Sequence, residues 1–190
     1  MRDQLFNDLV AVGAVLVVVV AGTIALTAFN SPAEAGPPSG APVSYLNLSI
    51  VINNTYSAAY GGSGWPQYTP ANFTVPEGFV IVTIHDHDTP AGWTQCTCAV
   101  RGTVGGTEKI NGTSVSQVNW KTVAHTFTVP TLGINVLSPA LSTVTFTLYL
   151  GKVGQFPWMC MAPCGGGSGG FGWPMFAPGF MAGTMTVAPG

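Results

Sequence analysis

Apolar and polar side chains alternate with a period of two over most of the chain beyond residue 42. Such alternation predicts β-strands with one buried face, and β-branched and aromatic residues enrich these segments. Glycine, proline and asparagine separate the segments, and no stretch there has the 3.6-residue period of an amphipathic helix. About seven short strands predict an all-β sandwich or small barrel with Greek-key connections. The clearest segments are 45–52, 72–84 (two strands around a Pro-Glu-Gly turn), 125–130, 142–150 and 183–188.

The N-terminal part has a different pattern, because residues 9–29 are almost all apolar and carry no charge. At about 1.5 Å per residue a helix of this length spans about 31 Å, which matches the core of a bilayer. We therefore expect residues 1–30 to form a single transmembrane anchor. A cleaved signal peptide is an alternative, since Ala33-Glu34-Ala35 resembles a cleavage site, but its apolar core is usually only about 7–15 residues long. A hydrophobic helix in a filament core is another.

Residues 31–42 (SPAEAGPPSGAP) predict an extended linker, followed by a domain over residues 43–190. Four N-x-[ST] sequons lie beyond the linker and favour an extracellular domain. Together with the apolar run, they predict a single-pass protein of the cell membrane with its domain on the extracellular side. The candidate glycosylation sites are Asn47, Asn53, Asn72 and Asn111.

Charged residues make up only 6% of the chain, against an ordinary value of about 25%. The formal net charge is −2 and there is no basic run, so nucleic acid is not an expected partner. The sequence also lacks a nucleotide-binding loop, a nucleophile elbow and a paired-carboxylate motif. We therefore expect a chain that is not catalytic by itself.

Four cysteines and three histidines are the candidate metal ligands. Cys160 and Cys164 lie four residues apart in FPWMCMAPCGGGSGG, a spacing compatible with a copper loop, a disulfide or a metal site that has lost a ligand. Cys96 and Cys98 lie close together in GWTQCTC. The segment HDHD (85–88) is a second possible metal cluster, and a polar turn after a strand is the simpler interpretation.

Three segments near the C-terminus, in the same order along the chain, resemble the cupredoxin domain of subunit II of haem–copper terminal oxidases. They are VAHTFTVPTLGINV (123–136), TVTFTLYLGKVGQFPWMC (143–160) and GFMAGTMTV (179–187), with FTVPEGFVIVTIHDHD (73–88) similar to the preceding strands. The resemblance implies a cupredoxin-like Greek-key sandwich and a copper centre. Its implied ligands are His125, Cys160, Cys164 and Met181, with the Ala162 carbonyl at the position of the bridging backbone oxygen.

One position departs from this family. Pro178 stands three residues before Met181, where the family has histidine, and a glycine-rich insertion separates it from Cys164. The missing imidazole implies a degenerate dinuclear motif that binds at most one copper ion. Residues 89–122 form an insertion that we expect near the metal end. If no metal holds the thiols, we expect at least one disulfide between the pair Cys96/Cys98 and the pair Cys160/Cys164.

The resemblance predicts a subunit II-like component of a membrane respiratory terminal oxidase, that is, a non-catalytic or electron-transfer subunit of an oxidoreductase complex. The degenerate motif is compatible with a quinol-oxidising type. Its partners would be membrane-embedded oxidase subunits and the lipid bilayer. Two alternatives stay open. One is a membrane-anchored copper electron carrier resembling sulfocyanin-type proteins, and the other is an extracellular filament or surface-layer subunit.

Overall fold

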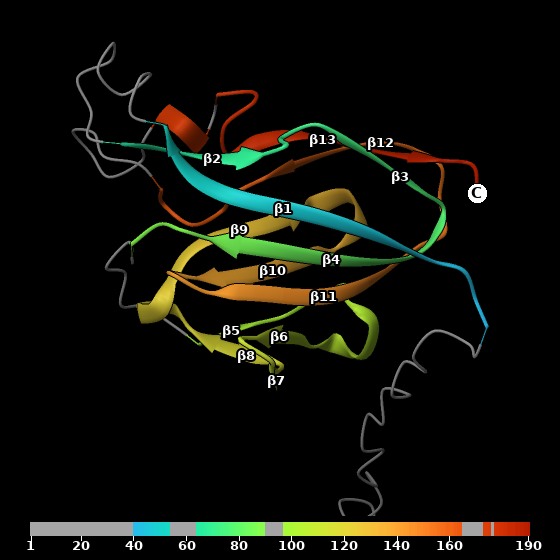
Figure 1. The fold of residues 1–190 in the computed structure, drawn as a ribbon, viewed down its shortest axis with the longest axis horizontal. Coiled ribbons are helices and arrows are strands. Elements are labelled where there is room, and N and C mark those ends of the chain that lie inside the picture. Colours follow the sequence, from blue (N-terminus) through green and yellow to red (C-terminus); the bar gives the residue numbers. More distant parts are fainter. Residues whose placement is uncertain (1–39, 54–63, 90–96, 165–172, 176) are drawn as a thin grey trace, which may run out of the picture. The chain divides into compact units, whose positions relative to one another are not determined.

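Two β-sheets packed face to face make up most of the part of the chain that the structure describes (Figure 1). The structure is a computed structural model and describes residues 40–53, 64–89, 97–164, 173–175 and 177–190. Within these ranges it contains thirteen strands and four short 3-10 helices. The predicted all-β sandwich is confirmed, with more strands than the sequence pattern indicated.

The first sheet has the strand order β2-β1-β4-β11-β6-β7. Its centre combines a parallel pair, β1 with β4, and an antiparallel pair, β4 with β11. In β4 and β11 alternate side chains are buried, as expected for strands with one face on the core. The strands are β1 (Val43–Asn53), β2 (Trp65–Thr69), β4 (Gly78–Asp86), β6 (Glu108–Ile110), β7 (Thr113–Val115) and β11 (Thr143–Leu150).

The second sheet has the order β10-β9-β12-β13-β3. Its strand β13 lies between β12 and β3, and pairs with β3 in parallel. The two strands predicted within 72–84 therefore belong to different sheets. The strands are β3 (Phe73–Pro76), β9 (Val123–Val129), β10 (Ile134–Pro139), β12 (Gly154–Met159) and β13 (Ala182–Ala188).

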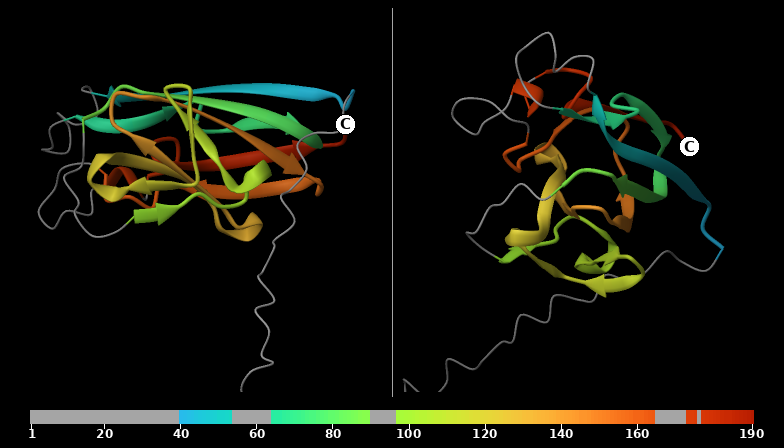
Figure 2. Two further views of the ribbon diagram at one scale, coloured as in Figure 1. Left: turned by 90° about the horizontal axis from the view of Figure 1, so that it is seen from below. Right: turned by 60° about the vertical axis from the view of Figure 1, so that its left-hand side comes forward.

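The described part of the predicted insertion joins the two sheets along one side (Figure 2). Arg101 exchanges two backbone hydrogen bonds with Asn135 of β10, at 2.9 and 3.0 Å. Further along, the Glu108 carboxylate accepts a hydrogen bond from the Leu137 N–H at 3.1 Å. The insertion thus covers the edge strand β10 of one sheet while β6 and β7 extend the other. Its remaining elements are β5 (Thr97–Ala99), η1 (Val104–Gly106), β8 (Gln117–Asn119) and η2 (Trp120–Thr122).

Aromatic side chains fill the core between the sheets. Tyr68 of β2 makes an edge contact with Trp158 of β12, with ring centroids 4.7 Å apart, and Phe127 of β9 lies 5.4 Å from Trp158. The Trp158 indole donates a hydrogen bond to the Ala71 carbonyl oxygen at 2.8 Å. Gly183, opposite Trp158 on β13, leaves room for this contact, because a Cβ there would overlap the Ala71 carbonyl group.

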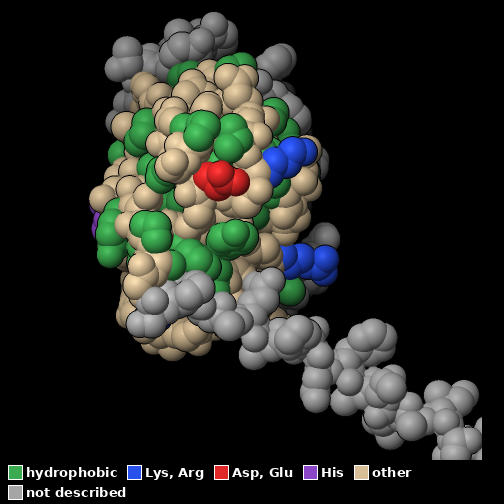
Figure 3. Space-filling view, turned by 90° about the vertical axis from the view of Figure 1, so that its right-hand side faces the viewer, with side chains coloured by type: hydrophobic (Ala, Val, Ile, Leu, Met, Phe, Trp, Pro, Cys, Tyr) green, Lys and Arg blue, Asp and Glu red, His purple; other side chains and the backbone are tan. Residues whose placement is uncertain are grey.

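The surface of the domain matches its low charge. In the face of Figure 3, hydrophobic and uncharged side chains predominate, with a few Lys, Arg, Asp or Glu side chains. The predicted membrane-spanning run 9–29 lies outside the described residues. Among the residues that are described, no helix is long and apolar enough to cross a membrane.

Candidate metal centre

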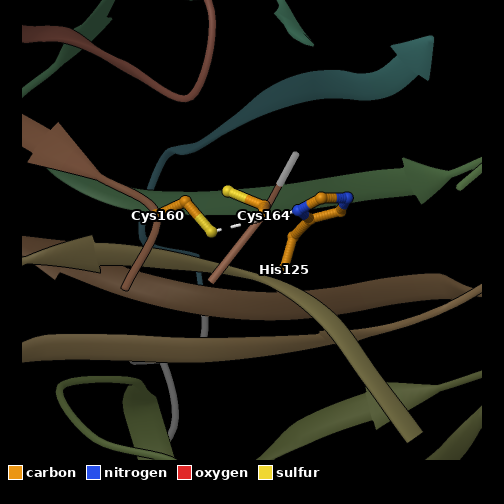
Figure 4. Close-up of side chains that lie close together, drawn as sticks. All are labelled: His125, Cys160 and Cys164. Carbon is orange, nitrogen blue, oxygen red and sulfur yellow. Dashed lines mark hydrogen bonds between the residues drawn. The ribbon is translucent and has the colours of Figure 1, made fainter. Parts of the chain in front are cut away.

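Three potential ligands meet inside the sandwich (Figure 4). The ligand atoms of His125, Cys160 and Cys164 all lie within 4.8 Å of one another, and all three residues are buried. His125 comes from β9, whereas Cys160 directly follows β12 and Cys164 lies four residues further along the loop. The structure therefore brings together three of the four ligands that the resemblance implied.

His125 reaches this position because it shares the inward face of β9 with Phe127 and Val129. All three are buried, and most residues on the opposite face of β9 are buried as well. Two hydrogen bonds with Thr126 of β9 hold Cys160 and Met161 beside this strand. The Thr126 N–H donates to the Cys160 sulfur at 3.3 Å, and the Met161 N–H donates to the Thr126 hydroxyl at 2.7 Å.

The two thiols have opposite proton affinities. Burial by itself raises the pKa of Cys160, but hydrogen bonds from Cys164 and His125 outweigh it and hold this pKa well below its usual value. The same hydrogen bond, together with burial, raises the pKa of the Cys164 thiol. The two shifts favour the thiolate form at Cys160 over the thiolate form at Cys164. A thiolate is the form in which cysteine binds metal.

The two imidazole nitrogens of His125 have different partners. Nε2 lies 2.9 Å from the Asp88 carboxylate, while Nδ1 faces the Cys160 sulfur at 3.9 Å. Burial lowers the pKa of His125, but the hydrogen bonds to Asp88 and Cys160 prevail and raise it to about 9. Since Nε2 is hydrogen-bonded to Asp88, Nδ1 is the nitrogen that points toward the candidate centre.

Met181, the fourth implied ligand, is fully buried. Its carbonyl oxygen accepts the N–H of Cys160 at 2.8 Å, and its own N–H donates to the Pro174 carbonyl of η4 (Trp173–Met175) at 3.1 Å. A direct hydrogen bond therefore joins the backbones of Met181 and Cys160. The Ala162 carbonyl oxygen, the implied bridging position, lies 3.3 Å from the Cys160 sulfur.

Neither of the other two histidines supplies the missing imidazole. His85 lies on the outer side of β4, where its Nδ1 is 3.2 Å from the Thr143 hydroxyl. His87 is exposed. Pro178, at the position of the family's second histidine, forms only a backbone bridge to Ala182. In the described part of the chain, the cluster contains one imidazole.

The predicted cross-loop disulfide does not form in this structure. Cys160 and Cys164 are free thiols, buried against His125. Cys98 lies on β5, where its backbone pairs with Val118 of β8, and it does not belong to the cluster. Cys96 lies outside the described residues. The disulfide does not form because the loop that carries Cys160 and Cys164 turns both thiols inward, toward the imidazole of His125.

The HDHD segment has a role that the sequence interpretation missed. We treated it as a polar turn, but Asp88 binds His125 and Asp86 is buried beside it. Only the position of the motif, directly after a buried strand, could have indicated this contact. Of the sequon asparagines, Asn47, Asn72 and Asn111 are exposed, and Asn53 donates a hydrogen bond to Gln67.

No family model and no curated protein matches the chain. Solved structures that are similar include a multi-copper oxidase from Pediococcus acidilactici, with 11% identity and a TM-score of 0.39 over 82% of this chain and 28% of that one. A Cu-containing nitrite reductase from Thermus scotoductus has 10% identity and a TM-score of 0.37, over 77% of this chain and 30% of the other. A variant of the laccase from B. aclada has 9% identity and a TM-score of 0.38, over 77% and 28%. This chain therefore spans less than a third of the length of each of these three, and such values assign it to no family.

Proposed function

We propose that this chain is a cupredoxin-type domain that binds one copper ion, and that it serves as a subunit II-like electron-transfer component of a membrane respiratory terminal oxidase. The copper proposal depends on one observation: the ligand atoms of the buried residues His125, Cys160 and Cys164 all lie within 4.8 Å of one another. The resemblance of residues 123–187 to subunit II, with the matching segments in the same order, supports the oxidase role. The anchor over residues 1–30 and the extracellular position of the domain belong to the same proposal.

The donor set fits copper. Two cysteine sulfurs, one imidazole and the thioether of Met181 are the soft ligands that suit Cu(I), and the imidazole also suits Cu(II). Copper would supply a one-electron cycle between these two states. The side chains would hold the ion in a buried pocket from which water is excluded, with little movement between the two states. Zinc also accepts such ligands, so metal analysis must include it.

A single ion is expected. A dinuclear centre with two bridging thiolates needs a terminal ligand set at each end, and Pro178 offers no donor where the second imidazole would lie. The remaining imidazole and thioether can complete one coordination sphere only.

The test is reconstitution of the full chain with copper, followed by metal analysis and absorption and EPR spectroscopy. We expect one copper per chain and a thiolate-to-Cu(II) charge-transfer band that disappears in His125→Ala and Cys160→Ser. His85→Ala and Cys98→Ser are matched controls outside the cluster and should keep both the stoichiometry and the band. Absence of bound copper in the unsubstituted chain, or equal loss in the controls, would overturn the proposal.

The oxidase role needs a separate experiment. We expect the chain to purify from membranes with a large haem-bearing subunit. A copper-loaded chain that purifies without haem would instead favour the membrane-anchored carrier, which the single-ion donor set also suits. Polymers of this chain on the cell surface, seen by electron microscopy, would favour the filament or surface-layer alternative.

A further inference from the structure

Three hydrogen bonds and one pairing between β9 and β10 form a closed ring that includes His125 and links the two sheets. From Nε2 of His125 the ring passes to the Asp88 carboxylate at 2.9 Å. The Asp88 N–H then donates to Asp86 Oδ1 at 2.9 Å, and Asp86 Oδ2 accepts the Ser138 hydroxyl at 2.7 Å. Ser138 lies directly opposite His125 in the β9–β10 ladder, which completes the ring.

Each member of this ring is held by further contacts. The second oxygen of Asp88, Oδ1, accepts the Thr89 N–H, at 2.6 Å, so the carboxylate has a fixed orientation. The Asp88 carbonyl accepts the N–H of Leu141 at 3.2 Å, which fixes its backbone. Asp86 and Ser138 are 3% and 0% exposed, so water does not compete for their hydrogen bonds. The imidazole is consequently restrained from the side opposite to the thiols.

The ring also decides which nitrogen is available. A carboxylate only accepts hydrogen bonds, so Nε2 must carry the proton in the neutral imidazole. The lone pair is then on Nδ1, which faces Cys160. A ligand histidine whose second nitrogen donates to a carboxylate is oriented by it and is a stronger donor to the metal.

We propose that Asp88 is the positioning residue of the candidate copper centre. It fixes the tautomer and orientation of His125, and its negative charge favours Cu(II) over Cu(I). Asp86, at the end of β4, and Ser138, on β10 of the other sheet, support it. This inference rests on the proposed copper-binding function and adds a specific residue to it.

The test compares Asp88→Asn and Asp88→Ala in the full chain. The asparagine oxygen can still accept from Nε2 but carries no charge, whereas alanine removes both the contact and the charge. We expect Asp88→Ala to lower Cu(II) affinity by about 10- to 100-fold, the usual effect of losing such a partner. Asp88→Asn should recover part of the affinity lost in Asp88→Ala. In both variants Cu(II) affinity should fall more than Cu(I) affinity, and the reduction potential should rise by about 59 mV for each tenfold difference.

The control is Glu77→Gln, which removes one carboxylate just before β4 rather than just after it. Glu77 is exposed and lies at the other end of that strand, so the potential should not change. If Asp88→Ala does not fold, the Asn variant alone decides, with thermal unfolding of the metal-free protein as the check on stability. Copper binding with an unchanged potential and unchanged EPR parameters in the Asp88 variants would overturn this inference and leave the copper proposal intact. No copper binding in the unsubstituted chain would overturn the copper proposal itself.

Discussion

The backbone N–H of Cys160 donates to the carbonyl oxygen of Met181 at 2.8 Å. This bond joins the end of β12 to the residue directly before β13, so the ligand loop is anchored on both neighbouring strands. The bond does not depend on the methionine side chain. The thioether can therefore be removed without releasing the loop.

We predict that Met181→Leu keeps the fold but weakens Cu(I) binding. The two side chains have similar volumes, so the free energy of unfolding should change by less than about 1.5 kcal/mol. Cu(I) affinity, measured by competition with a chelator, should fall because leucine has no sulfur. Met185→Leu is the matched control, since Met185 is also buried on this part of the chain but lies opposite Phe156 in the ladder. Equal Cu(I) affinity in both variants would exclude Met181 as a ligand.

We predict that the buried carboxyl group of Glu108 makes the free energy of unfolding depend on pH. Burial raises the pKa of its carboxyl group from 4.5 to about 7, although the hydrogen bond from the Leu137 N–H opposes this shift. The folded state therefore binds more protons than the unfolded state between about pH 4.5 and 7. Linkage then requires that the free energy of unfolding is highest below this window and falls as the pH rises through it.

Glu108→Gln should remove most of this decrease, which is on the order of 3 kcal/mol at most. The amide oxygen can still accept the Leu137 N–H, so the contact with β10 is kept. Urea unfolding of the metal-free protein at several pH values between 4.5 and 8 measures the effect. Glu77→Gln, at an exposed site, should keep the slope of the unsubstituted chain. An unchanged slope in Glu108→Gln would show that this carboxyl group is not the cause; burial also raises the pKa of Asp86, which would then be the next group to test.

Tyr68 should be replaceable by phenylalanine with a gain in stability. Its ring packs on Trp158, but its hydroxyl is buried and has no hydrogen-bond partner among the described residues. A buried group without a partner costs about 1–3 kcal/mol. We expect Tyr68→Phe to raise the free energy of unfolding by about 1 kcal/mol, measured by urea unfolding with an unchanged m-value. Tyr45→Phe, at a side chain that is 74% exposed, should have no effect, and a loss of stability in Tyr68→Phe would reveal a partner such as a buried water.

Gly183 should not tolerate alanine. The added Cβ would overlap the Ala71 carbonyl and approach the Trp158 Nε1 to 2.9 Å, so the hydrogen bond between these two groups would be lost. Overpacking of this kind costs about 1–3 kcal/mol. Gly151→Ala is the control, because its Cβ would meet only the ring of Tyr149, which is largely exposed. A thermal midpoint of Gly183→Ala equal to that of the control would contradict the described packing.

The sequence pattern predicted strands well where both neighbours in the sheet are regular. The segments 125–130 and 142–150 correspond to β9 and β11; burial alternates along β11, whereas β9 is buried on both faces. The pattern missed β2 and β12, which contain Pro66 and Pro157, residues that usually argue against a strand. It also gave no sign that β3 and β4 belong to opposite sheets, since that depends on pairing with strands far along the chain.

The site was predictable to a similar extent. His125 and the two cysteines were identified by resemblance, and they do lie together. The contact between Asp88, which follows β4, and His125 of β9 joins residues 37 positions apart, and these two strands belong to different sheets. Local spacing carries no information about such a contact, so Asp88 appeared only as part of a polar turn.

The interior position of β13 has a consequence for the time at which the centre can form. Because β13 lies between β12 and β3, these two strands have no common neighbour until residues 182–188 have been synthesised. Met181 directly precedes this strand, so the ligand set is complete only when almost the whole sheet can close. Segments made earlier can fold before this point during synthesis, but β3 cannot join the second sheet until β13 is present. Under the copper proposal, the ion can therefore find all its ligands only after residues 182–188 have been made, and both thiols must stay reduced until it binds.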